Sequence, residues 1–433
     1  MSRGKRSRGV CYGGIVKVCI LALVCLIGAG AFLLRSRQAA DPPAPPEAGS
    51  DTPEKSGGVP EPVPEPEPDE LEPEPDPRQV AVETLLSSMS LEEKVGQMFF
   101  ARCPDLAAAE KISQFHLGGY LLFTKDFKDS AGQWLSKEDF TAKIASYQAA
   151  SSVPMLIGAD EEGGTVARAS RNPNLFPEKF PSPQKVYAKG AATDPDNAFQ
   201  SGMKEIRRVE AEKNTGLRSY GINVNFAPVA DVSTDPGDFM NDRTFGQDAE
   251  KTARFVSMTV QEMSNAQVGA VLKHFPGYGN NADTHTGIAV DERPYEQFEQ
   301  TDFVPFRAGI EAGAGSVLVS HNIVSCMDGT LPASLSGKVH GILRYVLGFT
   351  GVVLTDDLAM DAVKAYAADG SVAVLAVQAG NDMIVTSDFE TQISQVIEAV
   401  NAGTIREGAI DAAVTRVLSW KYDLGLLDNS IEG

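Results

Sequence analysis

Short uninterrupted apolar runs recur along the chain from Gln79 onward and alternate with amphipathic stretches such as residues 200–218. Most runs lack polar alternation, which is typical of parallel strands covered on both faces. Eight strand and helix units predict an α/β fold, a single (β/α)8 TIM barrel over residues 79–433. The runs are residues 96–100, 119–123, 155–160, 224–229, 269–274, 316–321, 351–356 and 383–386.

Polar residues stand at the carboxyl ends of several of these runs, namely Asp160, Lys273, His274, His321 and Asp356. In TIM barrels this end of the strands carries the chemistry. Any one of these residues could instead be a helix cap or a satisfied rim residue, and for His321 a structural hydrogen bond is an equal alternative. Because several strands agree, we expect a functional site at this face. His116 and His340 are expected at surface or structural positions.

The first 78 residues differ in composition from the rest. Residues 1–14 are basic, residues 15–34 are apolar and nearly long enough to span a bilayer, and residues 35–78 are rich in Pro and Glu. We expect a cytoplasmic N-terminus, a single-pass transmembrane signal anchor in the cell membrane, a disordered linker and an extracytoplasmic domain. The alternative is a cleaved signal peptide, which would make the protein secreted.

Charge and cysteine content indicate which partners the protein is expected to bind and how its cysteines are expected to occur. The formal net charge is −20, of which the first forty residues contribute +7 and residues 41–78 contribute −10, so the barrel carries about −17. An acidic domain of this kind argues against nucleic acid as the main partner. Cys103 and Cys326 are the cysteines of the barrel, and we expect two separate buried thiols. Sequence leaves open whether they pair.

A loop rich in Gly, Asn and Asp follows Lys273 and His274 and carries Asp283 and His285. Their i, i+2 spacing puts both side chains on one side of an extended loop, where they can hydrogen-bond. A carboxylate partner favours the imidazolium and orients the ring for acid/base work. The alternatives are a loop turn or half of a metal site. Since no further His/Cys cluster has ligand spacing, we expect no metal and no cofactor.

Five motifs then occur in order: residues 160–164 (DEEGG), 225–231 (NFAPVAD), 242–246 (DRTFG), 273–277 (KHFPG) with 283–285 (DTH), and 355–360 (TDDLAM). Together they resemble glycoside hydrolase family 3, and within it the single-domain β-N-acetylglucosaminidase (NagZ-like) branch, over roughly residues 90–425. The resemblance implies a retaining exo-β-N-acetylhexosaminidase. Such an enzyme would release terminal β-linked N-acetylglucosamine from peptidoglycan fragments or related glycans through a glycosyl-aspartate intermediate.

The resemblance also implies roles for individual residues. Asp356 matches the nucleophile, and His285 oriented by Asp283 matches the acid/base. Alternate residues of a strand point oppositely, so Asp356 and Asp357 cannot both easily face the sugar. The resemblance implies that Asp356 does so, and we expect Asp357 to cap the next helix. Buried Arg and Lys could instead form internal ion pairs with Asp231 or Asp242. The sugar-binding residues implied are Asp160, Arg168, Arg243, Lys273 and His274.

Three positions depart from the family pattern, since Thr165, Tyr278 and Thr284 stand where relatives commonly have Arg, His and Ser. Because Tyr278 could alter the loop or the aglycone side of the site, the resemblance defines the cleaved sugar better than it defines the leaving group. The competing interpretations are a family 3 phosphorylase or transglycosidase, in which phosphate or a sugar replaces water, and a non-catalytic barrel that binds glycans. A β-glucosidase is disfavoured, because the chain has no room for their second domain and carries the Asp-x-His loop.

Overall fold

The computed structural model describes residues 76–279, 289–360, 363, 365–367 and 371–427. The predicted segments 1–14 and 15–34, and nearly all of 35–78, lie outside the described residues. Within the described part, no helix combines the length and apolarity needed to cross a bilayer.

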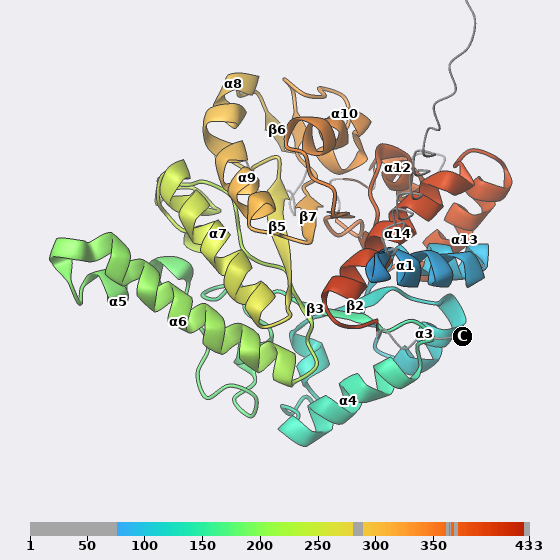
Figure 1. Ribbon diagram of the computed structural model, residues 1–433, viewed down its shortest axis with the longest axis horizontal. Coiled ribbons are helices and arrows are strands. Elements are labelled where there is room, and N and C mark those ends of the chain that lie inside the picture. Colours follow the sequence, from blue (N-terminus) through green and yellow to red (C-terminus); the bar gives the residue numbers. More distant parts are fainter. Residues whose placement is uncertain (1–75, 280–288, 361–362, 364, 368–370, 428–433) are drawn as a thin grey trace, which may run out of the picture. The chain divides into compact units, whose positions relative to one another are not determined.

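The described chain forms a barrel of parallel strands with helices around it (Figure 1). The strand order is β10-β1-β2-β3-β4-β5-β7-β9. Backbone hydrogen bonds from Thr355 N to Met383 O (3.1 Å) and from Leu358 N to Val385 O (2.9 Å) join β9 to β10 and close the ring. Each of the eight predicted runs overlaps one strand: β1 (Phe99–Arg102), β2 (Gly119–Leu122), β3 (Leu156–Ala159), β4 (Val224–Asn225), β5 (Gly269–Phe275), β7 (Ser316–Val319), β9 (Val352–Thr355) and β10 (Ile384–Thr386).

Helices follow the strands on the outside of the barrel (Figure 1). They are α1 (Pro77–Ser88), α2 (Leu91–Gln97), α3 (Ala108–Phe115), α4 (Lys137–Ala149), α5 (Pro183–Ala191), α6 (Ala198–Ser219), α7 (Ala249–Asn265), α8 (Tyr295–Gln297), α9 (Phe303–Glu311), α10 (Gly337–Gly341), α12 (Val372–Ala379), α13 (Phe389–Asn401) and α14 (Glu407–Asp423). The predicted helix at 200–218 is α6. Loops at the carboxyl ends of the strands carry the short 3₁₀ turns η1 (Thr124–Phe127), η2 (Ala169–Arg171) and η4 (Asn241–Arg243) and a two-stranded pair, β6 (Val290–Asp291) with β8 (Ile323–Val324).

The first strand begins later than the apolar pattern predicts. Ser90 and Glu93 form a capping box, with Glu93 N donating to Ser90 Oγ (3.3 Å) and Ser90 N donating to Glu93 Oε2 (2.8 Å). The helix α2 that this box starts runs to Gln97, so residues 96 and 97 are helical and not part of β1.

Large side chains from alternating strand positions fill the barrel interior. Phe100 and Phe226 meet edge to face there, with ring centroids 5.2 Å apart, and a Cβ at Gly158 would lie 2.8 Å from each ring. Gly158 therefore leaves the space that the two rings occupy. The barrel is a packed core rather than a channel.

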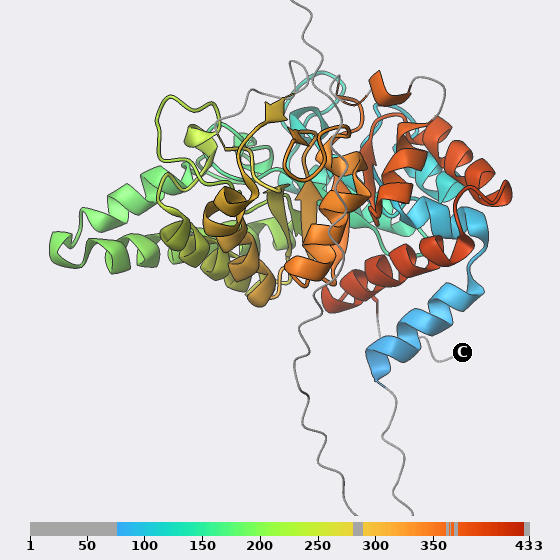
Figure 2. The same cartoon turned by 90° about the horizontal axis from the view of Figure 1, so that it is seen from above.

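Helix α14 closes the amino end of the barrel, the base, and α1 packs against it (Figure 2). Trp420 lies against the starts of two strands: a Cβ at Gly315 would lie 2.2 Å from Trp420 Nε1, and one at Gly269 would lie 2.7 Å from the ring. The next residue, Lys421, is fully buried and donates from Nζ to Gln97 Oε1 (2.6 Å). Burial lowers the pKa of Lys421 to about 7.

The two cysteines of the barrel are unpaired, as expected, but only Cys103 is buried, whereas Cys326 is exposed. The expectation of two buried thiols is therefore wrong for Cys326, which lies in the loop after β8. His340 is buried in α10, and His116 ends α3.

Candidate active site

A pocket of about 450 Å³ opens at the carboxyl ends of the strands. Part of its apolar lining comes from residues in or directly after strands that also pack the barrel interior: Leu121, Phe226, Leu318 and Val385. Its polar lining comes from loops and strand ends. The polar and aromatic residues are Arg102, Phe123, Asp160, Arg168, Phe239, Arg243, Lys273, His274, Tyr278, Asp356 and Asp357.

The five predicted sugar-binding residues all line this pocket together with Asp356. Asp160 directly follows β3, and Lys273 and His274 belong to the end of β5, joined by a cis peptide bond. Arg168 precedes η2, and Arg243 ends η4. Asp283 and His285 lie outside the described residues, so the structure brings together the predicted nucleophile and binding groups only.

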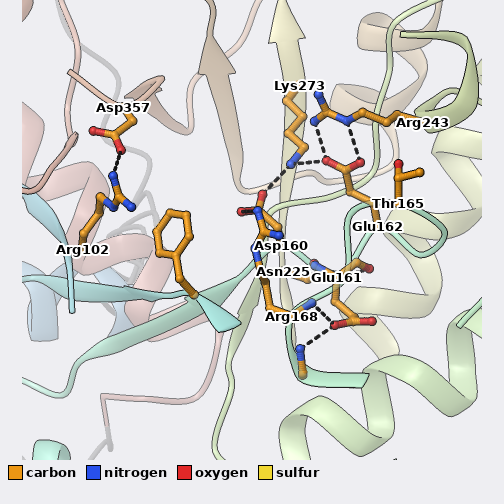
Figure 3. Close-up of polar contacts among 12 residues, drawn as sticks. Arg102, Asp160, Glu161, Glu162, Thr165, Arg168, Asn225, Arg243, Lys273 and Asp357 are labelled. Atoms are coloured by element: carbon orange, nitrogen blue, oxygen red, sulfur yellow. Dashed lines mark hydrogen bonds and ion pairs between the residues drawn. The ribbon is translucent and has the colours of Figure 1, made fainter. Parts of the chain in front are cut away.

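The buried Glu162, which is not itself a lining residue of the pocket, joins two of the predicted cations (Figure 3). The Glu162 carboxylate accepts hydrogen bonds from Arg243 Nε (3.0 Å) and Nη2 (2.7 Å), and its Oε1 lies 2.7 Å from Lys273 Nζ. Lys273 Nζ also donates to Asp160 Oδ1 at 2.7 Å. The cluster thus contains two carboxylates and two cations in continuous contact.

Burial and charge act oppositely on Glu162, which is only 4% exposed. Burial raises its pKa, but Arg243 and Lys273 outweigh burial and hold the pKa well below its usual value. Burial likewise lowers the pKa of Arg243, and Glu162 more than reverses this effect. The buried pair is therefore fully ionised. The alternative of internal ion pairs is therefore observed for Arg243 and Lys273, but their partner is Glu162, and for Lys273 also Asp160, rather than Asp231 or Asp242. Asp242 is exposed.

Asp231 instead holds His274. Asp231 Oδ2 lies 2.7 Å from His274 Nδ1 and accepts the His274 backbone amide at 3.1 Å, while Oδ1 accepts the amide of Tyr278 at 2.8 Å. The other imidazole nitrogen, Nε2, lies 3.3 Å from Arg243 Nη2. With Nδ1 protonated toward Asp231, Nε2 accepts from Arg243, so His274 is fixed at both nitrogens.

Glu161, the neighbour of Glu162, points into the backbone of the next loop. Its Oε2 accepts the amides of Arg168 (2.9 Å), Ala169 (2.8 Å) and Ser170 (3.1 Å), and Oε1 accepts the Ser170 hydroxyl. Burial raises the pKa of Glu161, and these hydrogen bonds oppose the effect. The loop that carries Arg168 is thereby anchored, with Arg168 Nη2 3.7 Å from Asp160 Oδ2.

Asp356 and Asp357 both line the pocket, and the expectation that Asp356 faces the sugar stays a prediction. The backbone of Asp356 donates to Val319 O (2.9 Å), and the Asp357 amide donates to Asp356 Oδ1 (2.8 Å). Asp357 Oδ1 accepts the Ala359 amide (2.9 Å), a turn contact in keeping with the expected capping, and Oδ2 pairs with Arg102 Nη1 (3.0 Å). Figure 3 shows the Asp357 carboxylate meeting the Arg102 guanidinium.

His321 contacts the same segment from below. It is fully buried, with Nε2 3.0 Å from Asp357 O and Nδ1 2.7 Å from Ser334 Oγ. Of the two expectations for His321, the structural hydrogen bond is the one observed. On the other side of the pocket, Phe123 lies between two guanidinium groups, 4.2 Å from that of Arg102 and 5.4 Å from that of Arg168.

No group of three or more His, Cys, Asp or Glu side chains arranged to hold a metal ion occurs among the described residues.

Comparisons with known proteins agree on one family. A profile of the "Glycosyl hydrolase family 3 N terminal domain" matches residues 90–420. The chain is 32% identical over 323 residues to a "Beta-hexosaminidase" of Xanthomonas campestris pv. campestris, covering 73% of this chain and 91% of the relative. A solved "glycoside hydrolase family 3 beta-N-acetylglucosaminidase" from Paenibacillus superposes with a TM-score of 0.68 at 30% identity, covering 78% of this chain and 63% of that one. A "Beta-N-acetylhexosaminidase" from Beutenbergia cavernae superposes with a TM-score of 0.65 at 29% identity, covering 77% and 99%.

Proposed function

The chain belongs to glycosyl hydrolase family 3 and is a glycoside hydrolase, and from this premise we propose that it is a retaining exo-β-N-acetylhexosaminidase. The proposed substrate is a glycan ending in β-linked N-acetylglucosamine, such as a peptidoglycan fragment. The observation that carries the proposal is the position of Asp356 in one pocket with the ion-paired cluster of Asp160, Lys273 and Arg243. The hexosaminidase and acetylglucosaminidase names of the relatives support the choice of sugar.

The pocket geometry supports cleavage from the end of a glycan. The packed barrel interior lies directly beneath the pocket, because four of its lining residues, Leu121, Phe226, Leu318 and Val385, also belong to the interior cluster. A sugar that enters from the mouth meets this floor and cannot continue through the barrel. A terminal residue therefore fits, and the rest of the glycan would extend outward.

Sugar hydroxyls would be held by groups that are already oriented. Asp160 Oδ1 is occupied by Lys273, whereas among the described residues Oδ2 has only the longer 3.7 Å contact with Arg168. A hydroxyl can donate to Oδ2 and accept from Arg168 at the same time, which forms charge-assisted hydrogen bonds at both ends. Because Glu162 and Asp231 fix Arg243 and His274 beforehand, binding costs little side-chain entropy.

Asp356 would attack the anomeric carbon and form a glycosyl ester as the glycosidic bond breaks. In the first step His285, oriented by Asp283, would give its proton to the leaving oxygen. In the second it would take a proton from the water that cleaves the ester. Two displacements return the sugar with the β configuration it had in the substrate.

The proposed setting is outside the cytoplasm, with the apolar segment 15–34 as membrane anchor and the Pro/Glu-rich segment 35–78 as spacer. An enzyme held in this way would meet wall glycans. Protease accessibility of the barrel on intact cells measures this directly, and protection from added protease would refute it.

The function is tested by comparing hydrolysis of an aryl β-N-acetylglucosaminide and an aryl β-glucoside by the full-length chain, with and without phosphate. We expect release from the acetamido sugar alone, with the β anomer as first product by proton NMR. An α product would refute the retaining mechanism. Sugar 1-phosphate formed only with phosphate would identify a phosphorylase, and a folded chain that releases neither aglycone would be a binding protein.

Asp356→Asn is expected to lower kcat by about 10³-fold or more, because an amide cannot form the ester intermediate, while ligand affinity is kept. Asp388→Asn, at an exposed position before α13, is the matched control and should leave kcat unchanged. Turnover that survives in Asp356→Asn would show that another residue is the nucleophile.

A further inference from the structure

Three rings form a continuous wall from the inner cluster to the edge of the pocket. The imidazole of His274 and the ring of Tyr278 meet edge to face, with centroids 5.2 Å apart and planes at 86°. Tyr278 and Phe239 repeat this arrangement at 5.5 Å and 76°. His274 and Tyr278 are buried, but Phe239 is 40% exposed. Phe239 is thus the outermost of the three rings.

The loop that carries Phe239 is braced by its own side chains. Asp235 Oδ1 accepts the Gly237 amide (2.8 Å), and the Ser233 hydroxyl donates to Asp238 Oδ2 (2.8 Å). From the other end of the loop, Asn241 donates to Ser233 O (3.3 Å). Phe239 is therefore held on a shaped loop, and a ligand that contacts its ring need not order the loop first.

Packing does not account for the position of Phe239. The small apolar cluster beneath it consists of Val229, Met240 and Tyr278, and Phe239 is not a member of that buried set. Among the described residues, Phe239 and Tyr345 are the strongly exposed aromatic side chains, and of these two only Phe239 lines the pocket. An exposed, immobilised aromatic face beside a polar sugar site is suited to the C–H face of a second sugar ring.

We propose that Phe239, supported by Tyr278, forms the binding surface for the leaving-group sugar and determines the preference for the part of the substrate beyond the cleaved bond. The inference rests on the proposed function, in which the sugar to be removed occupies the inner cluster around Asp160 and Lys273. The ligand class is a glycan whose penultimate residue is a pyranose with an apolar face. Leaving groups without a ring gain nothing from this surface.

Phe239→Ala tests the proposal when a leaving group with a ring is compared with one without. For N,N′-diacetylchitobiose we expect kcat/KM to fall about 10- to 30-fold, the effect of losing the apolar contact of one exposed aromatic face. For β-N-acetylglucosaminyl fluoride we expect a change below about twofold, since fluoride offers no ring to stack. Phe239→Trp should keep the activity on the disaccharide.

Tyr345→Ala removes an aromatic ring that is 89% exposed and does not line the pocket, and should change neither rate. Equal losses on the disaccharide and the fluoride would place Phe239 at the cleaved sugar or in a structural role and overturn the proposal, as would no loss on either. If the wild-type chain cleaves β-glucosides instead, the same comparison is made with cellobiose and β-glucosyl fluoride, so failure of the acetamido assignment leaves the test of Phe239 intact. A wild-type chain that cleaves neither series would overturn both proposals.

Discussion

Replacing Glu162 by Gln removes a negative charge from the point where two buried cations meet. In the wild-type chain the Glu162 carboxylate accepts Arg243 at 2.7 and 3.0 Å and Lys273 at 2.7 Å. The amide of Gln can accept one of these donors, but its NH₂ group then faces the other. Lys273 keeps Asp160, whereas Arg243 loses its carboxylate partner. Breaking a buried pair in this way costs about 3 to 5 kcal/mol of unfolding free energy.

Urea denaturation of Glu162→Gln and wild type measures this loss. The matched control is Glu212→Gln, because Glu212 pairs with Arg208 at a similar 2.9 Å but is 57% exposed in its side chain. An exposed pair contributes at most about 1 kcal/mol, so the control should shift the unfolding free energy little. The contrast isolates burial, since the ion-pair lengths are nearly the same.

A double-mutant cycle with Arg243→Met sharpens the test. Removing both partners leaves no unpaired charge between Glu162 and Arg243, so the double variant should be at least about 2 kcal/mol more stable than the sum of the single effects predicts. Additive effects, or a loss below about 1 kcal/mol for Glu162→Gln alone, would refute the description of this cluster as a desolvated ion-pair network.

Two further predictions concern the base of the barrel. Gly315→Ala should lower the unfolding free energy by about 1 to 3 kcal/mol, because the new Cβ would meet Trp420. Gly408→Ala, at a helical position in α14 with open space around it, should raise the unfolding free energy by about 0.5 to 1 kcal/mol. Urea midpoints that move alike in the two variants would contradict this. Lys421 has a folded pKa of about 7 against 10.5 for the free group, so between these pH values the unfolded state binds more protons than the folded state. The unfolding free energy of wild type relative to that of Lys421→Met should therefore rise as pH increases from about 7 to about 10. A difference that stays constant from pH 7 to 10 would show that Lys421 does not titrate in this range.

The strands were predictable because each is short, apolar and covered on both faces, a pattern that amphipathic helices do not share. Positions at the ends of those runs then identified Asp160, Lys273 and Asp356 without any knowledge of contacts. The start of β1 was misplaced because an apolar stretch continues from α2 into the strand, and the capping box at Ser90 alone does not say where the helix ends.

Which side chains contact one another within the site could not be predicted from the spacing of residues in the sequence. Glu161 and Glu162 are adjacent and chemically alike, yet one binds backbone amides of its own loop and the other binds Arg243, 81 residues away. Which of them meets Arg243 and Lys273 depends on the path of the loop after β3. The role of Phe239 was likewise not predictable from sequence, because it depends on the contact of its ring with Tyr278, which lies in another loop.

The position of α1 and α14 has a practical consequence. Both helices lie at the base, where α14 packs against the first residues of β5 and β7 through Trp420. The described chain therefore enters at Pro77 on the end of the barrel remote from the pocket mouth (Figure 2). A support, fusion partner or label joined ahead of α1 would therefore leave the pocket mouth facing the bulk solution.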